Sequence, residues 1–269
     1  MPIRNQRDLK GATVKPTIIE TEHLSKSYAT DGVQTHVLSA IDLRLYEGDF
    51  TAIMGPSGSG KSTLLYCLSG MDSVTAGDVL YRGKSIVDLK EQNMAKLRSE
   101  HFGFVFQQAH LVSNLTLFEN IVVPGYLKEE RSAADTRDLA QGLIDRMGLA
   151  PDAHHLPSQT SGGQQQRCAV ARSVVNDPDI VFADEPTGAL NRANTLEVLS
   201  LLCELNAGGQ TICMVTHDVQ CSLRANRILY LEDGSISGEL ELPVWRDGDV
   251  AFAKAREAQV TSWLSSLSW

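Results

Sequence analysis

The sequence predicts an α/β fold built on a parallel β-sheet that carries helices on both of its faces. Strand-like and helical segments alternate in the second half of the chain, where Ile180–Ala183 predicts a strand, Thr195–Leu205 a helix and Thr211–Thr216 another strand. A further strand, loop and helix lie around residue 55. Alternation of this kind is typical of parallel sheets, because each helix returns the chain to the start of the next strand. No internal repeat is visible, so we expect one such unit.

Other segments predict a smaller sheet and a helical region. Gly77–Gly83 indicates a strand and a turn, and the chain becomes helical in pattern from Leu117 to about Gly148, most clearly over Ala133–Met147. The β-rich runs near the N-terminus are Ile18–Glu20, Val37–Leu38 and Ile41–Leu45.

The segment GPSGSGKST matches G-x-x-x-x-G-K-[S/T], a loop that holds the phosphates of a nucleotide. Phe50–Met54 before it indicates a buried strand and Leu64–Leu68 after it a helix, which is the context that such a loop requires. Glycines let the backbone approach a ligand closely, and the free amides of a helix N-terminus favour anions. We expect Lys61 to place a charge at the β- and γ-phosphates of ATP or GTP and the Ser62 hydroxyl to ligate Mg²⁺. The residues expected to bind the nucleotide are Gly55, Pro56, Ser57, Gly58, Ser59, Gly60, Lys61, Ser62 and Thr63.

Composition excludes several classes of protein. A formal net charge of −9 argues against a nucleic-acid-binding footprint, which needs a basic patch. The five cysteines form no C-x-x-C pair, so they are expected to be reduced core thiols of a cytosolic protein. No window approaches the length of a continuous apolar span, and residues 1–15 are polar without an apolar stretch. We therefore expect neither a membrane span nor a secretion signal.

Two further motifs follow the phosphate loop. Thr160–Arg167 contains Ser-Gly-Gly before the helical run Cys168–Val175, and it is either a second anion-binding surface or only a helix N-cap. Ile180–Glu185 is an apolar strand that ends in two acids. Asp184 suits the outer coordination sphere of Mg²⁺, and Glu185 suits polarisation of an attacking water. Adjacent acids usually mark a solvated turn, but the order and spacing after the phosphate loop favour the catalytic interpretation.

Together these motifs resemble the ATP-binding-cassette (ABC) ATPases over about residues 17–240. Thr160–Arg167 is similar to the signature loop of that family, which is more diagnostic than the phosphate loop alone. The resemblance implies an α/β fold with a P-loop NTPase (RecA-like) core, a small antiparallel β subdomain and an inserted α-helical subdomain at about residues 108–165. Residues 1–16 are expected to form a flexible lead-in and residues 241–269 a C-terminal extension.

The same resemblance implies roles for further residues. Tyr28 matches an aromatic residue that stacks on adenine, and His217 matches a histidine that contacts the γ-phosphate. Gln107 matches a glutamine that senses Mg²⁺ and the attacking water; Gln108 competes for this assignment, but Gln107 directly follows the strand-like Phe104–Phe106. The implied catalytic residues are Lys61, Gln107, Glu185 and His217, the implied metal site is Ser62, Gln107 and Asp184, and the signature residues expected to contact ATP are Ser161, Gly162 and Gly163.

Two positions depart from the family pattern. The signature usually opens with Leu, where this chain has Thr160, and the loop after the two acids usually ends in Asp, where this chain has Asn191. Asparagine keeps hydrogen-bonding capacity and loses the charge. Because the implied catalytic residues are all present, we expect an active ATPase. The two departures are expected to alter the geometry across the dimer and to slow turnover.

The resemblance implies a subunit that binds ATP and Mg²⁺, forms a head-to-tail homodimer and drives a separate integral-membrane permease from the cytoplasmic face of the cell membrane. The sequences of two segments resemble those of the subgroup that serves macrolide or peptide-antibiotic export, lipoprotein release and cell division. These segments are Gly103–Gln107 and Pro186–Leu190. The alternative is a non-transport regulator that couples ATP cycling to a membrane protein in cell-wall hydrolysis or signalling. No nucleic-acid partner is expected.

The C-terminal extension predicts an amphipathic helix from Val250, with Asp247 or Asp249 as its cap. Its apolar residues recur at helical spacing, so they form one stripe. The stripe either packs back onto the cassette or docks on a partner or membrane surface, for which tryptophan is suited. Its members are Val260, Trp263, Leu264 and Leu267.

Overall fold

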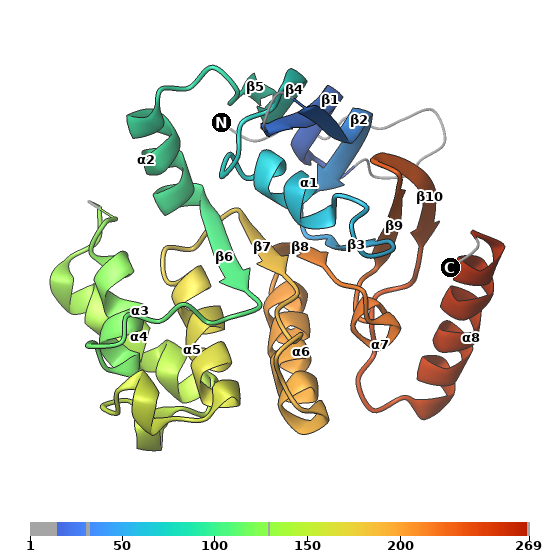
Figure 1. Cartoon of the computed structure of the whole chain (residues 1–269). Helices are drawn as coiled ribbons and strands as arrows, with labels where there is room; N and C mark the ends of the chain where they lie inside the picture. Colours follow the sequence, from blue (N-terminus) through green and yellow to red (C-terminus); the bar gives the residue numbers. More distant parts are fainter. Residues whose placement is uncertain (1–14, 31–32, 129, 268–269) are drawn as a thin grey trace.

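In the computed structural model, which describes residues 15–30, 33–128 and 130–267, the chain folds around a six-stranded sheet (Figure 1). The strand order is β10-β9-β3-β8-β7-β6, and all neighbours are parallel except β9 and β10. The predicted parallel sheet is therefore confirmed. The strands are β3 (Phe50–Met54), β6 (Phe102–Phe106), β7 (Ile180–Asp184), β8 (Thr211–Val215), β9 (Arg227–Glu232) and β10 (Ser235–Glu241).

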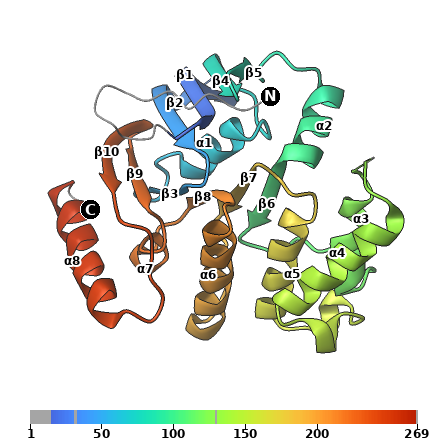
Figure 2. The ribbon, with the colours of Figure 1, turned by 180° about the vertical axis from the view of Figure 1, so that it is seen from behind.

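Side chains of the central strands alternate between two hydrophobic cores. In β7, Val181 and Ala183 join one core, whereas Ile180 and Phe182 join the other. Successive residues of a strand point to opposite faces, so a strand buried on both faces is apolar throughout. Helix α1 (Lys61–Leu68) covers one face, and α5 (Gly162–Val174) and α6 (Arg192–Ala207) cover the other (Figures 1 and 2).

A second, antiparallel sheet lies on the α1 side, in the order β2-β1-β4-β5. Its strands are β1 (Thr17–Thr30), β2 (Val33–Tyr46), β4 (Ala76–Tyr81) and β5 (Lys84–Ser85). The short runs predicted near the N-terminus are in fact parts of two 14-residue strands. Register shifts interrupt the pairing of β1 with β2 around Thr21 to Ser27, and His23 adopts a positive φ of 50° there. These bulges break the alternation of apolar residues, which explains why the runs look separate in the sequence.

Helices lie before and after β6 in the chain. Helix α2 (Glu91–His101) precedes that strand, and α3 (Leu117–Gly125) and α4 (Ala133–Arg146) come after it. Thr116 caps α3 in a capping box with Glu119, and Ser132 caps α4. Two short 3₁₀ turns, Ala150–Asp152 and Pro157–Gln159, lead into α5, which packs against α3 and α4. The expected limit of the helical subdomain at residue 165 falls inside α5.

The C-terminal segment forms α8 (Val250–Ser266), beside β9 and β10 and near the short α7 (Val219–Ser222) (Figure 1). Of the two candidate caps it is Asp249 that accepts a hydrogen bond from the Phe252 amide, at 2.9 Å. Val260 and Leu264 are fully buried in the core, with Trp263 and Leu267 packed against it. The stripe therefore packs back onto the cassette.

The five cysteines are free, and four of them are buried. Among the described residues, no helix combines the length and the apolar character needed to cross a membrane. Most of the predicted N-terminal lead-in, residues 1–14, and Trp269 lie outside the described residues. The sequence analysis did not predict α2, β9 and β10, and it placed the start of the α5 helical run at Cys168 instead of Gly162.

Candidate nucleotide-binding and hydrolysis site

The loop between β3 and α1 has a backbone that only glycine can adopt at its critical points. Gly55 has φ of +152°, and a Cβ there would lie 2.0 Å from the carbonyl oxygen of Leu231. Gly60 caps α1 in the left-handed conformation, with φ of +98°. The loop therefore leaves its backbone uncovered beside the N-terminus of α1, which is the arrangement that binds phosphate.

This loop forms one wall of a pocket of about 650 Å³. Side chains from two other strand ends form the opposite wall, so Glu185, His217 and most of the predicted loop residues meet at one cavity. The lining residues are Val37, Gly55, Ser57, Gly58, Gly60, Lys61, Ser62, Thr63, Glu185 and His217.

Lys61 is 7% exposed and folds back over its own loop. Its Nζ donates to the carbonyl oxygens of Gly55 at 2.9 Å and Pro56 at 2.7 Å. Burial lowers the pKa of Lys61, while the charges of Glu185 and Asp184 act to raise it. A buried cation next to backbone amides matches the charge of nucleotide phosphates.

Asp184, the last residue of β7, faces α1. Its Oδ1 accepts a hydrogen bond from the Ser62 hydroxyl at 2.8 Å, and its Oδ2 accepts one from the Tyr66 hydroxyl at 2.6 Å. The carboxylate and hydroxyl oxygens form the hard donor set that Mg²⁺ prefers. The sequence analysis did not identify Tyr66; its spacing of i+4 from Ser62 on α1 is the signal that could have found it.

Glu185 follows β7 in a strained conformation, with φ of +46°. Its amide donates to the Val215 carbonyl at 2.9 Å, which fixes the turn against β8. The side-chain Oε1 lies 2.8 Å from Nδ1 of His217. The carboxylate and the imidazole therefore face the pocket as a hydrogen-bonded pair.

The strand register explains why residues distant in sequence meet here. Phe106 of β6, Asp184 of β7 and Val215 of β8 lie opposite one another in the parallel sheet. The residues that follow these three strand ends therefore emerge at the same edge, where α/β proteins bind ligands.

Gln107 emerges at that edge beside Glu185. A Cβ on Gly188 would lie 3.0 Å from Nε2 of Gln107 and 3.2 Å from Oε2 of Glu185, so both side chains flank this glycine. Gln107 is therefore adjacent to Glu185, and its assignment in preference to Gln108 stays a prediction.

The signature residues Ser161, Gly162 and Gly163 are not part of this pocket lining. Ser161 is the N-cap of α5, and it exchanges hydrogen bonds with Gln164 in a capping box. Ser161 therefore caps α5, and because a helix N-terminus also favours anions, binding of a phosphate by this motif stays a prediction.

Tyr28 is also outside the pocket lining, on the exposed face of β1. Its ring is 40% exposed, and its hydroxyl donates to Oδ2 of Asp72 at 2.6 Å. Lys26 lies 4.7 Å from the ring centre and donates to Oδ1 of the same Asp72 at 2.6 Å. Lys26 and Asp72 thus hold the Tyr28 ring in place, and the ring can present one face to a base.

The two departures from the family pattern have local structural roles. Asn191 is the N-cap of α6, accepting a hydrogen bond from the Asn194 amide at 3.0 Å. Asparagine caps helices as well as aspartate does, so this substitution keeps the helix start. The Thr160 hydroxyl donates to the carbonyl of Pro157 at 2.9 Å.

The fold and motifs match known proteins. A profile of the ABC transporter family matches residues 38–188. The macrolide export ATP-binding/permease protein MacB of Pasteurella multocida is 44% identical over 220 residues, which are 81% of this chain and 34% of that protein. The chain thus spans about a third of the length of such relatives. An uncharacterized ABC transporter ATP-binding protein of Methanocaldococcus jannaschii is 43% identical over 81% of this chain and 97% of that protein.

Solved structures agree. The dimeric ATP-binding cassette MJ0796 in a post-hydrolysis state bound to ADP and Pi has a TM-score of 0.78 at 37% identity, over 85% of this chain and all of that chain. A second dimeric structure of MJ0796, a bacterial ABC transporter cassette, has a TM-score of 0.79 at 38% identity. The chain belongs to the ABC transporter family, and it is an ATPase cassette of that family.

Proposed function

We propose that this cassette is the ATP-hydrolysing subunit of a membrane transport complex and drives a separate integral-membrane permease from the cytoplasmic face. The proposal rests on one observation: the predicted ATP-binding residues lie at two separate places on the cassette. Lys61, Glu185 and His217 line one pocket, whereas Ser161 and its neighbours lie outside it at the α5 N-terminus. Two copies in head-to-tail arrangement would bring each α5 N-terminus to the phosphates held by the other copy.

Each residue of the pocket has a separate role in ATP hydrolysis. Lys61 and the loop amides bind and orient the phosphates, which removes the entropic cost of positioning from the chemical step. Ser62 and Asp184 would hold Mg²⁺, which supplies charge neutralisation at the β- and γ-phosphates. Glu185 accepts the proton of the attacking water, and His217 holds the Glu185 carboxylate in place. Gln107, beside Glu185, orients the water.

ATP would join the two copies, because the α5 amides complement γ-phosphate charge that Lys61 only partly neutralises. Loss of the γ-phosphate would remove that attraction and release the dimer, which converts hydrolysis into motion. Both MJ0796 structures are dimeric, which supports the pairing of two cassettes.

The similarity to proteins named macrolide export ATP-binding/permease supports a permease partner of the exporter type. We test it by affinity capture of tagged Glu185→Gln protein from detergent-solubilised native membranes, with ATP and Mg²⁺ or with ADP. The proposal expects a multispanning permease that is retained with ATP. Recovery of soluble proteins alone, from a sample that binds ATP, would overturn it. Substrate movement by vesicles that hold the captured complex distinguishes transport from the alternative, ATP-driven regulation of cell-wall hydrolysis or signalling.

A further inference from the structure

Helix α1 contacts Asp184 at two points. Ser62 and Tyr66 are four residues apart, so they lie on the same face of the helix, one turn from each other. Ser62 donates to Oδ1 of Asp184 at 2.8 Å, and Tyr66 donates to Oδ2 at 2.6 Å. Each carboxylate oxygen therefore has its own donor from the same helix.

This double contact fixes the orientation of the carboxylate. The terminal torsion of an aspartate side chain has broad energy wells, so one hydrogen bond leaves the carboxylate free to rotate. A second donor on the other oxygen removes that freedom. Asp184 is only 8% exposed, so little water is available to replace a lost donor.

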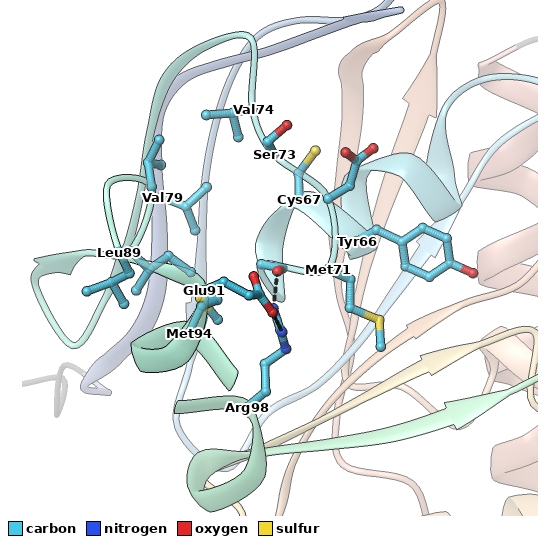
Figure 3. A pocket seen from close by; sticks show the side chains of 14 residues that line it. Tyr66, Cys67, Met71, Ser73, Val74, Val79, Leu89, Glu91, Met94 and Arg98 are labelled. Atoms are coloured by element: carbon cyan, nitrogen blue, oxygen red, sulfur yellow. Dashed lines mark hydrogen bonds and ion pairs between the residues drawn. The ribbon is translucent and has the colours of Figure 1, made fainter. Parts of the chain in front are cut away.

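Tyr66 also borders a different cavity, of about 560 Å³, between α1, β4 and α2. In Figure 3 the ring extends away from the aliphatic side chains Val74, Val79 and Leu89 on the far side of that cavity. The ring therefore points toward Asp184, to which its hydroxyl donates. A phenylalanine fits in the same place and removes only the hydroxyl.

We propose that Tyr66 is a positioning residue for the magnesium–nucleotide site, holding Asp184 in the orientation in which it faces Ser62. This inference rests on the proposed function, because it assumes that Asp184 and Ser62 hold Mg²⁺. The Ser62 hydroxyl can donate its proton to Asp184 and still offer a lone pair to a metal. Tyr66 itself offers no ligand to the metal in this proposal; its hydroxyl donates to Asp184, so its role is to orient the acid.

The test compares Tyr66→Phe with a matched control, Tyr81→Phe. The Tyr81 hydroxyl also donates to an aspartate, Asp179, but neither residue lines the nucleotide pocket. Binding of Mn²⁺, as a paramagnetic substitute for Mg²⁺, is titrated by electron paramagnetic resonance with the protein in molar excess over ATP, so that little free ATP competes for the metal. ATP affinity in EDTA is measured separately by calorimetry. The Glu185→Gln background prevents turnover in both.

We expect Tyr66→Phe to weaken Mn²⁺ binding about tenfold, the usual size of the effect when a residue that orients a metal ligand is lost. ATP affinity in EDTA should stay at the Glu185→Gln value, and Tyr81→Phe should change neither quantity. Unchanged Mn²⁺ binding in Tyr66→Phe would overturn the role of Tyr66. Weakened ATP affinity in EDTA would overturn it too, because the residue would then support the whole pocket. Failure of the parent Glu185→Gln protein to bind Mn²⁺ with ATP would instead contradict the proposed function.

Discussion

Nδ1 of His217 lies 2.8 Å from Oε1 of Glu185, although the two residues follow different strands. Glu185 leaves β7 with a positive φ of 46°, and this conformation turns its side chain toward the end of β8. Strain of this kind costs about 1–3 kcal/mol and persists where the surroundings enforce it. The pair is therefore built into the sheet edge, and we expect it to act as a unit in hydrolysis.

Replacing Glu185 with Gln should lower the ATP turnover rate at least about 100-fold, because the general base is lost while the shape remains. Each tenfold loss corresponds to about 1.4 kcal/mol of barrier. Phosphate release at saturating ATP measures the rate, and calorimetry should find ATP affinity unchanged. Turnover at the wild-type rate would remove Glu185 from the mechanism.

His217→Ala should also slow turnover, by about 100-fold, because the residue that fixes the base and meets the γ-phosphate is lost. The matched control is His23→Ala, which removes an exposed histidine of the small sheet. Equal rates for the two variants would argue against the His217 assignment.

Tyr28→Ala should weaken ATP binding by about 1–3 kcal/mol, the usual value of a base stacked on an aromatic ring. Tyr28→Phe keeps the ring and removes only the hydrogen bond to Asp72, so its loss should be smaller. Calorimetry with ATP and with triphosphate separates the base contribution, since triphosphate has no ring to stack. A loss that is equal for ATP and triphosphate would contradict stacking.

Gly55→Ala should abolish ATP binding and lower the unfolding temperature, because the new Cβ would meet the Leu231 carbonyl at 2.0 Å. Gly48→Ala is the matched control, since Gly48 has φ of +75° and open space around it. The control should cost only the strain of a left-handed residue, about 1–2 kcal/mol. Normal nucleotide binding by Gly55→Ala would show that the loop can relax.

Leu264→Ala should destabilise the protein by about 2–5 kcal/mol, because it leaves a cavity where α8 packs on the core. Lys254→Ala, on the exposed side of the same helix, should change stability by less than about 0.5 kcal/mol. Chemical denaturation measures both. Wild-type stability of Leu264→Ala would mean that α8 is not docked in solution.

The position of Asp184, Glu185 and His217 at one edge of the sheet could be predicted from the sequence, because each lies close in sequence to a recognisable strand. Asp184 ends the apolar strand β7, Glu185 follows it directly, and His217 lies two residues after β8; apolar runs of that length are readable in a sequence. Helix α2 was missed because Met94 is its only buried residue, so it has no apolar stripe to detect. The strand β9 was missed because a short apolar run is ambiguous until its neighbours are known, and β10, SISGELE, contains no apolar run at all.

The contacts of Tyr66 and Tyr28 could not be predicted in the same way. Tyr66 reaches Asp184 across 118 residues of sequence, and Tyr28 reaches Asp72 across 44. Such contacts exist only once the sheet places α1 beside β7 and the small sheet beside the end of α1. A side-chain partner of this kind is a property of the tertiary fold, whereas a motif is a property of the chain.

The central claim is that one ATP is hydrolysed between Lys61 of one copy and Ser161 of another, and mixing two inactive variants tests it most directly. Lys61→Ala removes the phosphate-binding charge, and Ser161→Glu places a negative charge where the γ-phosphate would lie. A mixed dimer contains one site in which both residues are intact. The account predicts that the mixture regains ATPase activity that neither variant shows alone, whereas a mixture as inactive as its components would contradict it.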